Sequence, residues 1–187
     1  MALLALARRF PILAATVVCL ASARAAAAQA QTAAIEANVK AVFLYNFSKY
    51  VTWPPVVLGE RSPAEVRICV TADDGFFALL KEAVQGETID GKPLLPVALT
   101  GLDDARTCQI LYVGDARTPD ARAWLNAVRG SQVLTVADGE MLRDEPVIAF
   151  VRDDNRLRFD INRAAASRHG LNVSAKLLRL ARQVRDR

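Results

Sequence analysis

Short apolar runs alternate with helical patterns along the middle of this chain, and that alternation constrains the fold more than any other feature. Val66–Thr71 reads as a strand with Val66, Ile68 and Val70 on one side, and residues 109–113 have the apolar character of a buried strand. A helical pattern follows each of them. Strands that alternate with helices are typical of a mostly parallel sheet that is covered on both faces. The sequence therefore predicts an α/β fold, a three-layer α/β/α sandwich.

Turn and capping residues place the other elements of this sandwich. Asp90 and Gly91 form a predicted turn, and residues 153–155 form a hairpin turn that adds an antiparallel edge near the C-terminus. Gly170 suits the end of one closing helix, and Ser174 suits the start of the next. The predicted strands are 66–71, 94–99, 109–113, 132–136, 147–151 and 157–161, and the predicted helices are 35–53, 74–85, 102–106, 119–128, 139–142, 163–169 and 174–185.

The first helix of the domain carries a dense set of aromatic side chains. Its helical pattern starts at Ile35, after a polar lead-in at 29–34 that we expect to fray, and Pro54 ends it. Residues near its main face are Ile35, Val39, Val42, Phe43, Asn46, Phe47, Tyr50 and Val51. Leu44 and Tyr45 lie off that face, so the helix is either enclosed by the core or partly used as a partner-binding or homodimer surface. The candidate partner-binding residues are Phe43, Leu44, Tyr45, Phe47, Tyr50 and Trp53.

Residues 1–30 have the pattern of a secretory signal. Arg8 and Arg9 precede an apolar run at 12–21, and small residues with A-x-A spacing follow, which predicts cleavage near 23–30. The run of about ten apolar residues is shorter than the roughly 20 residues that cross a bilayer. We therefore expect a cleaved signal peptide, a single mature domain over 31–187, and a location in the periplasm.

Loss of the signal would remove most of the positive charge of the chain. The formal net charge is +4, and without Arg8, Arg9 and Arg24 it becomes +1. Nucleic-acid binding needs a concentrated basic surface, so we expect no nucleic-acid partner. The last predicted helix has a basic face, which is expected either to be solvated or to contact anionic lipid. This face comprises Lys176, Arg179, Arg182 and Arg185.

The mature chain would keep two of the three cysteines, because Cys19 lies in the predicted signal. Cys69 and Cys108 most simply pair in an oxidising compartment, and two separate buried thiols are the alternative. They do not form a C-x-x-C motif, which argues against a thiol oxidoreductase. Two thiols with no nearby histidine do not complete a metal shell, so we predict no metal site.

The residues show no recognisable catalytic site. His169 is the single histidine, and its place at a predicted helix end is typical of a surface or capping residue. The chain has neither a serine elbow motif nor a glycine loop for phosphate, and its paired aspartates fall in predicted turns or helix starts. We therefore predict no catalytic residue and no cofactor.

Segments near both ends of the mature chain carry a longer pattern. Residues 40–54 read K-A-V-F-L-Y-N-F-S-K-Y-V-T-W-P, and residues 158–166 read R-F-D-I-N-R-A-A-A. Residues 170–181 then read G-L-N-V-S-A-K-L-L-R-L-A, and the strands R-I-C-V and T-C-Q-I-L-Y-V lie between the two ends. With these motifs in this order, the chain resembles the YfiR family of periplasmic proteins.

The resemblance implies a regulator without enzymatic activity. The best-understood members of the family bind the periplasmic sensor part of a membrane diguanylate cyclase and hold it inactive, which lowers cyclic di-GMP and restrains biofilm formation. An outer-membrane lipoprotein commonly withdraws the repressor. The family also places a disulfide at the positions of Cys69 and Cys108, whereas a second cysteine pair of some members has no counterpart here. The alternative function is a small-molecule-binding module, because α/β sheets form ligand crevices at strand ends.

Overall fold

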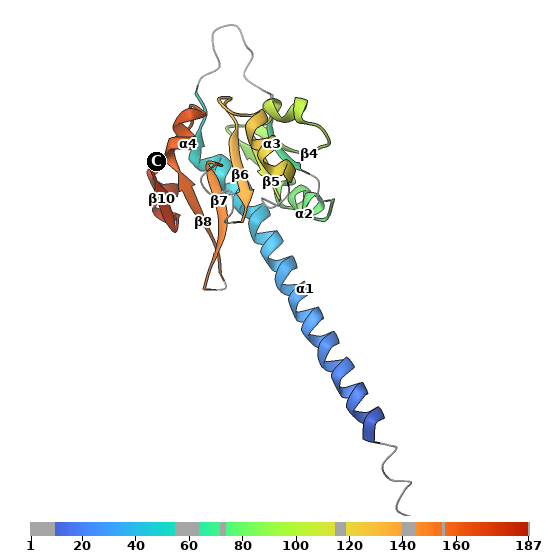
Figure 1. The fold of residues 1–187 in the computed structure, drawn as a ribbon. Coiled ribbons are helices and arrows are strands. Elements are labelled where there is room, and N and C mark those ends of the chain that lie inside the picture. Colours follow the sequence, from blue (N-terminus) through green and yellow to red (C-terminus); the bar gives the residue numbers. More distant parts are fainter. Residues whose placement is uncertain are drawn as a thin grey trace, which may run out of the picture. The chain divides into compact units, whose positions relative to one another are not determined.

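Figure 1 shows the fold in a computed structural model, which describes residues 10–54, 64–71, 74–114, 119–139, 145–154 and 156–186. For residues 10–28 the description covers the backbone alone. The chain divides into two units, Met1–Ala37 and Asn38–Arg187. The described part of the first unit is a stretch of helix, and the second unit holds the α/β fold.

The second unit is built around an eight-stranded sheet with the order β10-β8-β7-β6-β5-β2-β4-β3. The five strands from β4 to β7 in this order pair in parallel, and β7 and β8 form an antiparallel hairpin. This arrangement confirms the predicted mostly parallel sheet with a C-terminal hairpin. The strands are β2 (Val66–Thr71), β3 (Thr88–Ile89), β4 (Lys92–Leu99), β5 (Ile110–Val113), β6 (Leu134–Asp138), β7 (Ile148–Asp153), β8 (Arg156–Asn162) and β10 (Gln183–Arg185).

Helices cover both faces of this sheet, as the three-layer prediction requires. Side chains of β5 alternate between the faces: Leu111 packs in a cluster with Leu125 of α3, whereas the ring of Tyr112 lies 4.6 Å from that of Phe76 in α2. On the same side as α2, Phe47 of α1 packs against Phe150 of β7. The helices are α1 (Phe10–Tyr50), α2 (Asp74–Val84), the 3₁₀ helix η1 (Leu102–Thr107), α3 (Pro119–Ala127), α4 (Arg163–Arg168) and α5 (Ala175–Leu180).

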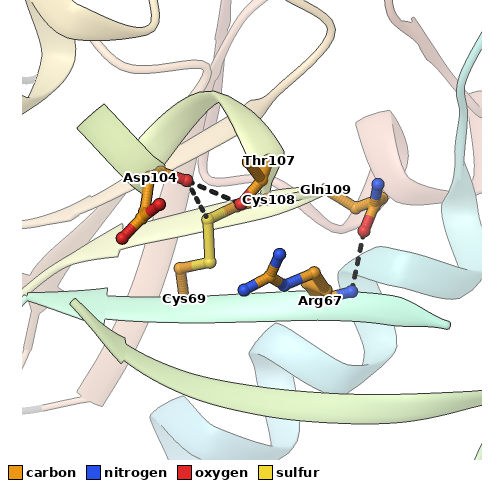
Figure 2. The surroundings of a disulfide bond; sticks show 6 residues. All are labelled: Arg67, Cys69, Asp104, Thr107, Cys108 and Gln109. Carbon is orange, nitrogen blue, oxygen red and sulfur yellow. Dashed lines mark hydrogen bonds between the residues drawn. A yellow bond between two sulfur atoms is a disulfide. The ribbon is translucent and has the colours of Figure 1, made fainter. Parts of the chain in front are cut away.

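A disulfide joins Cys69 in β2 to Cys108, which lies just before β5 (Figure 2). Their Cα atoms are 5.9 Å apart, and both residues are buried. Next to the bond, the Gln109 side chain accepts a hydrogen bond from the backbone N–H of Arg67, and the Gln109 N–H donates to the Arg67 carbonyl. The pairing confirms the predicted disulfide over two free thiols, and the closed loop stabilises the fold by roughly 3–4 kcal/mol in the chain-entropy model.

The local predictions of turns and caps are confirmed where residues are described. Asp90 and Gly91 both have positive φ, as does Gly170 at the end of α4. The Ser174 hydroxyl accepts a hydrogen bond from the Leu177 N–H at the start of α5. Strand β6 starts two residues later than predicted, because the Ser131 N–H closes a turn onto the Val128 carbonyl. Most of the predicted helical turn at 139–142 lies outside the described residues.

The opening helix starts earlier than the sequence predicts. Helix α1 runs back to Phe10, whereas the pattern placed its start at Ile35 and a frayed lead-in at 29–34. Alanine has the highest intrinsic helix propensity, and alanines are frequent through this stretch. The apolar spacing marks the part of the helix that can pack, not the point where the helix begins.

The prediction of one closing helix over 174–185 is wrong. Helix α5 ends at Leu180, and β10 then pairs in parallel with β8. The reason is Asp160 of β8, whose side chain is only 2% exposed. Its carboxylate accepts two hydrogen bonds from Arg182, at 2.9 and 2.7 Å, and one from Arg185 at 2.8 Å. A buried carboxylate needs such partners, so these two arginines face the sheet and not an exposed basic surface.

A short antiparallel pair was also absent from the sequence prediction. Strand β1 (Val51–Thr52) pairs with β9 (Asn172–Val173), and the Ser174 N–H donates to the Tyr50 carbonyl. This pair connects the end of α1 to the segment between α4 and α5.

Candidate functional site

The C-terminal part of α1 packs on the domain through a face that overlaps the predicted one only in part. Leu44 and Phe47 are 0% exposed, and Ala41, Ser48 and Val51 are buried with them. These positions are three or four residues apart, which places them on one side of a helix. Leu44, expected off the main face, therefore lies in the core. Leu44 and Phe47 were candidate partner-binding residues, and in this structure neither has surface to offer a partner.

Aromatic rings hold this part of α1 against the β7–β8 hairpin. The ring centroid of Phe47 lies 5.1 Å from that of Phe159 in β8 and 5.8 Å from that of Phe150 in β7. Phe43 is half-buried, and its ring lies 5.5 Å from that of Phe159 in an edge-on arrangement. Aromatic pairs at these spacings contribute beyond the area they bury. The prediction that Phe43 belongs to the main face is consistent with this contact.

An ion pair fixes the same helix to the end of β6. The Nζ atom of Lys40 lies 2.7 Å from Oδ2 of Asp138, with the lysine side chain buried and the carboxylate half-buried. No local sequence pattern indicated this pair, because the two residues are far apart along the chain and ordinary in their surroundings.

The three remaining aromatic candidates, two in α1 and one just after β1, are half-buried, and polar partners hold two of them. The Tyr45 hydroxyl donates to the Glu87 carboxylate, and the Lys49 Nζ lies 3.7 Å from the centroid of the Tyr45 ring. The Lys176 Nζ lies 5.2 Å from the centroid of the Tyr50 ring. These rings are oriented but keep part of their surface available, as interface anchors do.

Trp53, just after β1, has a different environment. Its indole is half-buried, and its Nε1–H is buried without a hydrogen-bond partner among the described residues. Buried tryptophan N–H groups usually find an acceptor, so this is a costly arrangement.

One face of α1 is apolar and exposed. Val39 is exposed and Val42 is 49% exposed, and Ile35, in the first unit, is exposed as well. The sequence pattern placed all three on the main face, and in the structure the Val39 and Val42 side chains are not packed on the sheet. Two sets of apolar residues with helical spacing occur between 38 and 51, and only the set containing Ala41 and Leu44 packs on the sheet. The small side chain of Ala41, which permits close packing, was the signal that could have distinguished the two sets.

The single histidine is at a helix end, as predicted, but it is not on the surface. His169 caps the C-terminus of α4 and is 6% exposed, with Nδ1 2.7 Å from the Ser131 carbonyl oxygen. Burial lowers the pKa of the ring below its ordinary value, and the neighbouring Arg168 and Arg129 lower it further. The ring is therefore neutral near pH 7 and does not act as a cation at the helix end.

Within the part of the chain that the structure describes, His, Cys, Asp and Glu side chains form no group of three able to hold a metal ion. Over the same residues, no helix combines the length and the apolar character that crossing a bilayer needs.

The described residues thus form a disulfide-linked α/β domain whose opening helix leaves an apolar stripe uncovered. The sequence also assigns this domain to a protein family. The chain belongs to the YfiR/HmsC-like family, because the model of that family matches residues 37–182. This match confirms the resemblance carried by the motifs near the two ends.

No curated protein matches the chain, whereas solved structures do. One of them is the ABC domain in complex with L-Trp from Streptococcus pneumonia, with a TM-score of 0.46 and 11% sequence identity. The match covers 66% of this chain and 56% of that one, so the chain spans little more than half of that structure's length.

Proposed function

We propose that this protein is a periplasmic regulator without catalytic activity. It binds the periplasmic sensor part of an inner-membrane diguanylate cyclase and holds the enzyme inactive, which lowers cyclic di-GMP. The observation that carries the proposal is membership of the YfiR/HmsC-like family across residues 37–182, nearly all of the α/β domain.

Two features support the periplasmic location. Residues 1–30 have the pattern of a cleaved signal peptide. The disulfide between Cys69 and Cys108 is a bond that forms and persists in oxidising compartments and is rare in the cytosol. Sequencing the N-terminus of the protein isolated from the periplasm tests this part: a start between residues 24 and 31 is expected, and an intact Met1 contradicts it.

The contact surface in this proposal is the uncovered stripe of α1 together with the ring of Tyr45 beside it. Val39 and Val42 supply the apolar centre, and Tyr45 supplies an oriented aromatic edge. Interface cores are rich in such groups and poor in charge. The half-buried rings of Tyr50 and Trp53 extend the surface, and the ring of Phe43 packs next to it against Phe159 of β8.

The same stripe also fits a second copy of the chain. A homodimer through α1 would compete with cyclase binding. We further propose that an outer-membrane lipoprotein binds the regulator and withdraws it from the cyclase.

Deletion of the gene tests the function. We expect cellular cyclic di-GMP to rise in the deletion strain and to return to its starting level when the wild-type gene is restored. An unchanged level under several growth conditions contradicts the proposal.

A further inference from the structure

A cavity of about 370 Å³ lies between α3 and α4. Its lining residues are Leu125, Arg129, Glu145, Arg168 and His169. Ligand pockets in proteins have volumes of roughly 300–1,000 Å³, so the cavity is large enough for a small molecule.

The position of the cavity relative to the sheet is unusual for an α/β fold. Ser131, which accepts the hydrogen bond of His169, precedes β6, and Glu145 precedes β7. The cavity therefore lies at the amino-terminal ends of two parallel strands. Ligands of open α/β sheets commonly bind at the opposite, carboxyl-terminal ends. The fold alone predicts a ligand crevice at the carboxyl-terminal strand ends, whereas this cavity lies at the amino-terminal ends.

The charge of the lining favours an anion. The one carboxylate, of Glu145, lies 3.1 Å from the Arg122 guanidinium, which compensates its charge. Arg129 donates to the neutral side-chain oxygen of Asn126, at 2.8 Å. No ion pair between described residues involves Arg168. Two guanidinium groups thus keep positive charge at the cavity, and guanidinium forks match carboxylate and phosphate groups.

His169 adds a hydrogen-bond acceptor to this positive lining. A carbonyl oxygen can only accept, so the short contact with Ser131 requires the proton on Nδ1. Because the ring is buried and neutral near pH 7, Nε2 carries a lone pair that can accept a hydrogen bond. Leu125 supplies an apolar wall.

We propose that this cavity binds a small organic anion. Arg129 and Arg168 bind its carboxylate or phosphate group, and a hydroxyl or N–H group of the same molecule donates to Nε2 of His169. The proposal does not depend on the cyclase-regulating function, and its test needs only the purified protein.

The single histidine of the chain makes the test direct, because its ring gives one unambiguous NMR signal. The protein is titrated with glycerol 3-phosphate, with glycerate and with glycerol, which share hydroxyl groups but differ in their anionic group. We expect at least one of the two anions to shift the His169 signal saturably, and glycerol to leave it in place. The anion that saturates the shift shows whether the site prefers a phosphate or a carboxylate group.

Substitutions of the two arginines complete the test. Arg168→Gln and Arg129→Gln are each expected to weaken binding of the effective anion by at least tenfold. Arg156→Gln, an exposed arginine at the far end of β8, is the matched control and keeps wild-type binding. Because all three arginines are exposed, each variant is expected to unfold at the wild-type temperature. The proposal is overturned if neither anion saturates the shift, if glycerol binds equally well, or if both variants bind as the wild type does.

Discussion

Lys40 of α1 and Asp138 at the end of β6 form a 2.7 Å ion pair that fixes the opening helix to the sheet. The two residues are 98 positions apart in the sequence. Because the lysine side chain is buried, the pair gives the helix one orientation on the sheet, and that orientation leaves Val39 and Val42 uncovered.

Removal of this carboxylate is expected to destabilise the domain. Asp138→Asn removes the carboxylate that pairs with the buried Lys40 ammonium group, and we expect the free energy of unfolding to fall by about 1–3 kcal/mol. Urea unfolding measures the change. Asp186→Asn breaks the ion pair with Arg163 in which both side chains are exposed, and it is expected to change stability by less than about 0.5 kcal/mol. Equal effects of the two substitutions would contradict the structural role of the Lys40 pair.

The core and the surface of α1 are expected to respond differently to truncation. Leu44→Ala removes a fully buried side chain, and we expect a loss of about 2–5 kcal/mol. Val42→Ala removes a similar apolar group from an exposed position and is expected to change stability by no more than about 0.5 kcal/mol. Thermal unfolding of both variants checks the assignment. A large loss for Val42→Ala would show that its side chain is covered.

Val42→Glu is expected to impair regulation without unfolding the protein. A carboxylate at the centre of an apolar interface is desolvated without a partner, so we expect partner binding to weaken on the order of tenfold or more. The measurement is cellular cyclic di-GMP in the deletion strain that carries the variant. Leu102→Glu is the control, because Leu102 is 42% exposed in η1, outside the stripe. If both variants restored a low cyclic di-GMP level, the stripe would not be part of the interface.

Loss of the disulfide is expected to lower stability by roughly 3–4 kcal/mol. Cys69→Ala with Cys108→Ala, compared with the wild type in urea, measures this change without reductant. The oxidised wild-type protein, denatured and treated with a thiol reagent, should label no thiol of the mature chain. Labelling of two thiols would show that the bond does not form in the cell.

The acid limb of the stability profile is expected to depend on Asp160. Burial raises the pKa of this carboxyl, but the hydrogen bonds and charges of Arg182 and Arg185 outweigh burial and lower it below the ordinary value of 3.8. The unfolded chain therefore binds the proton more readily, so the contribution of Asp160 is present above about pH 4 and is lost as the pH falls through the folded-state pKa. Asp160→Asn should be less stable than the wild type at pH 7, with a difference that shrinks below pH 4. A difference that does not vary between pH 7 and pH 3 would contradict this origin.

Local patterns in the sequence predict the inner strands of the eight-stranded sheet, the turns and the caps. The alternation around β2 and β5, the Asp90–Gly91 turn and the Ser174 cap each depend on neighbouring residues, and the structure has all of them. The fold class follows from their order along the chain.

The errors occur where distant residues decide the outcome. Helix α1 has two apolar stripes, and only the contact with the sheet selects the one that contains Leu44. The residues of β10 have a helical pattern, but the buried carboxylate of Asp160 draws Arg182 and Arg185 into a strand beside β8. Likewise, the cavity at His169 needs residues from α3, α4 and the segment before β7, which no local pattern brings together.

The disulfide has a consequence for the integrity of the chain. The bond between Cys69 and Cys108 closes a covalent ring that contains α2, β3, β4 and η1. A protease that cuts one peptide bond inside this ring cannot release a fragment, because both new ends remain attached through the sulfur atoms. The strands at this edge of the sheet can thus be nicked once and still return to their places beside β2.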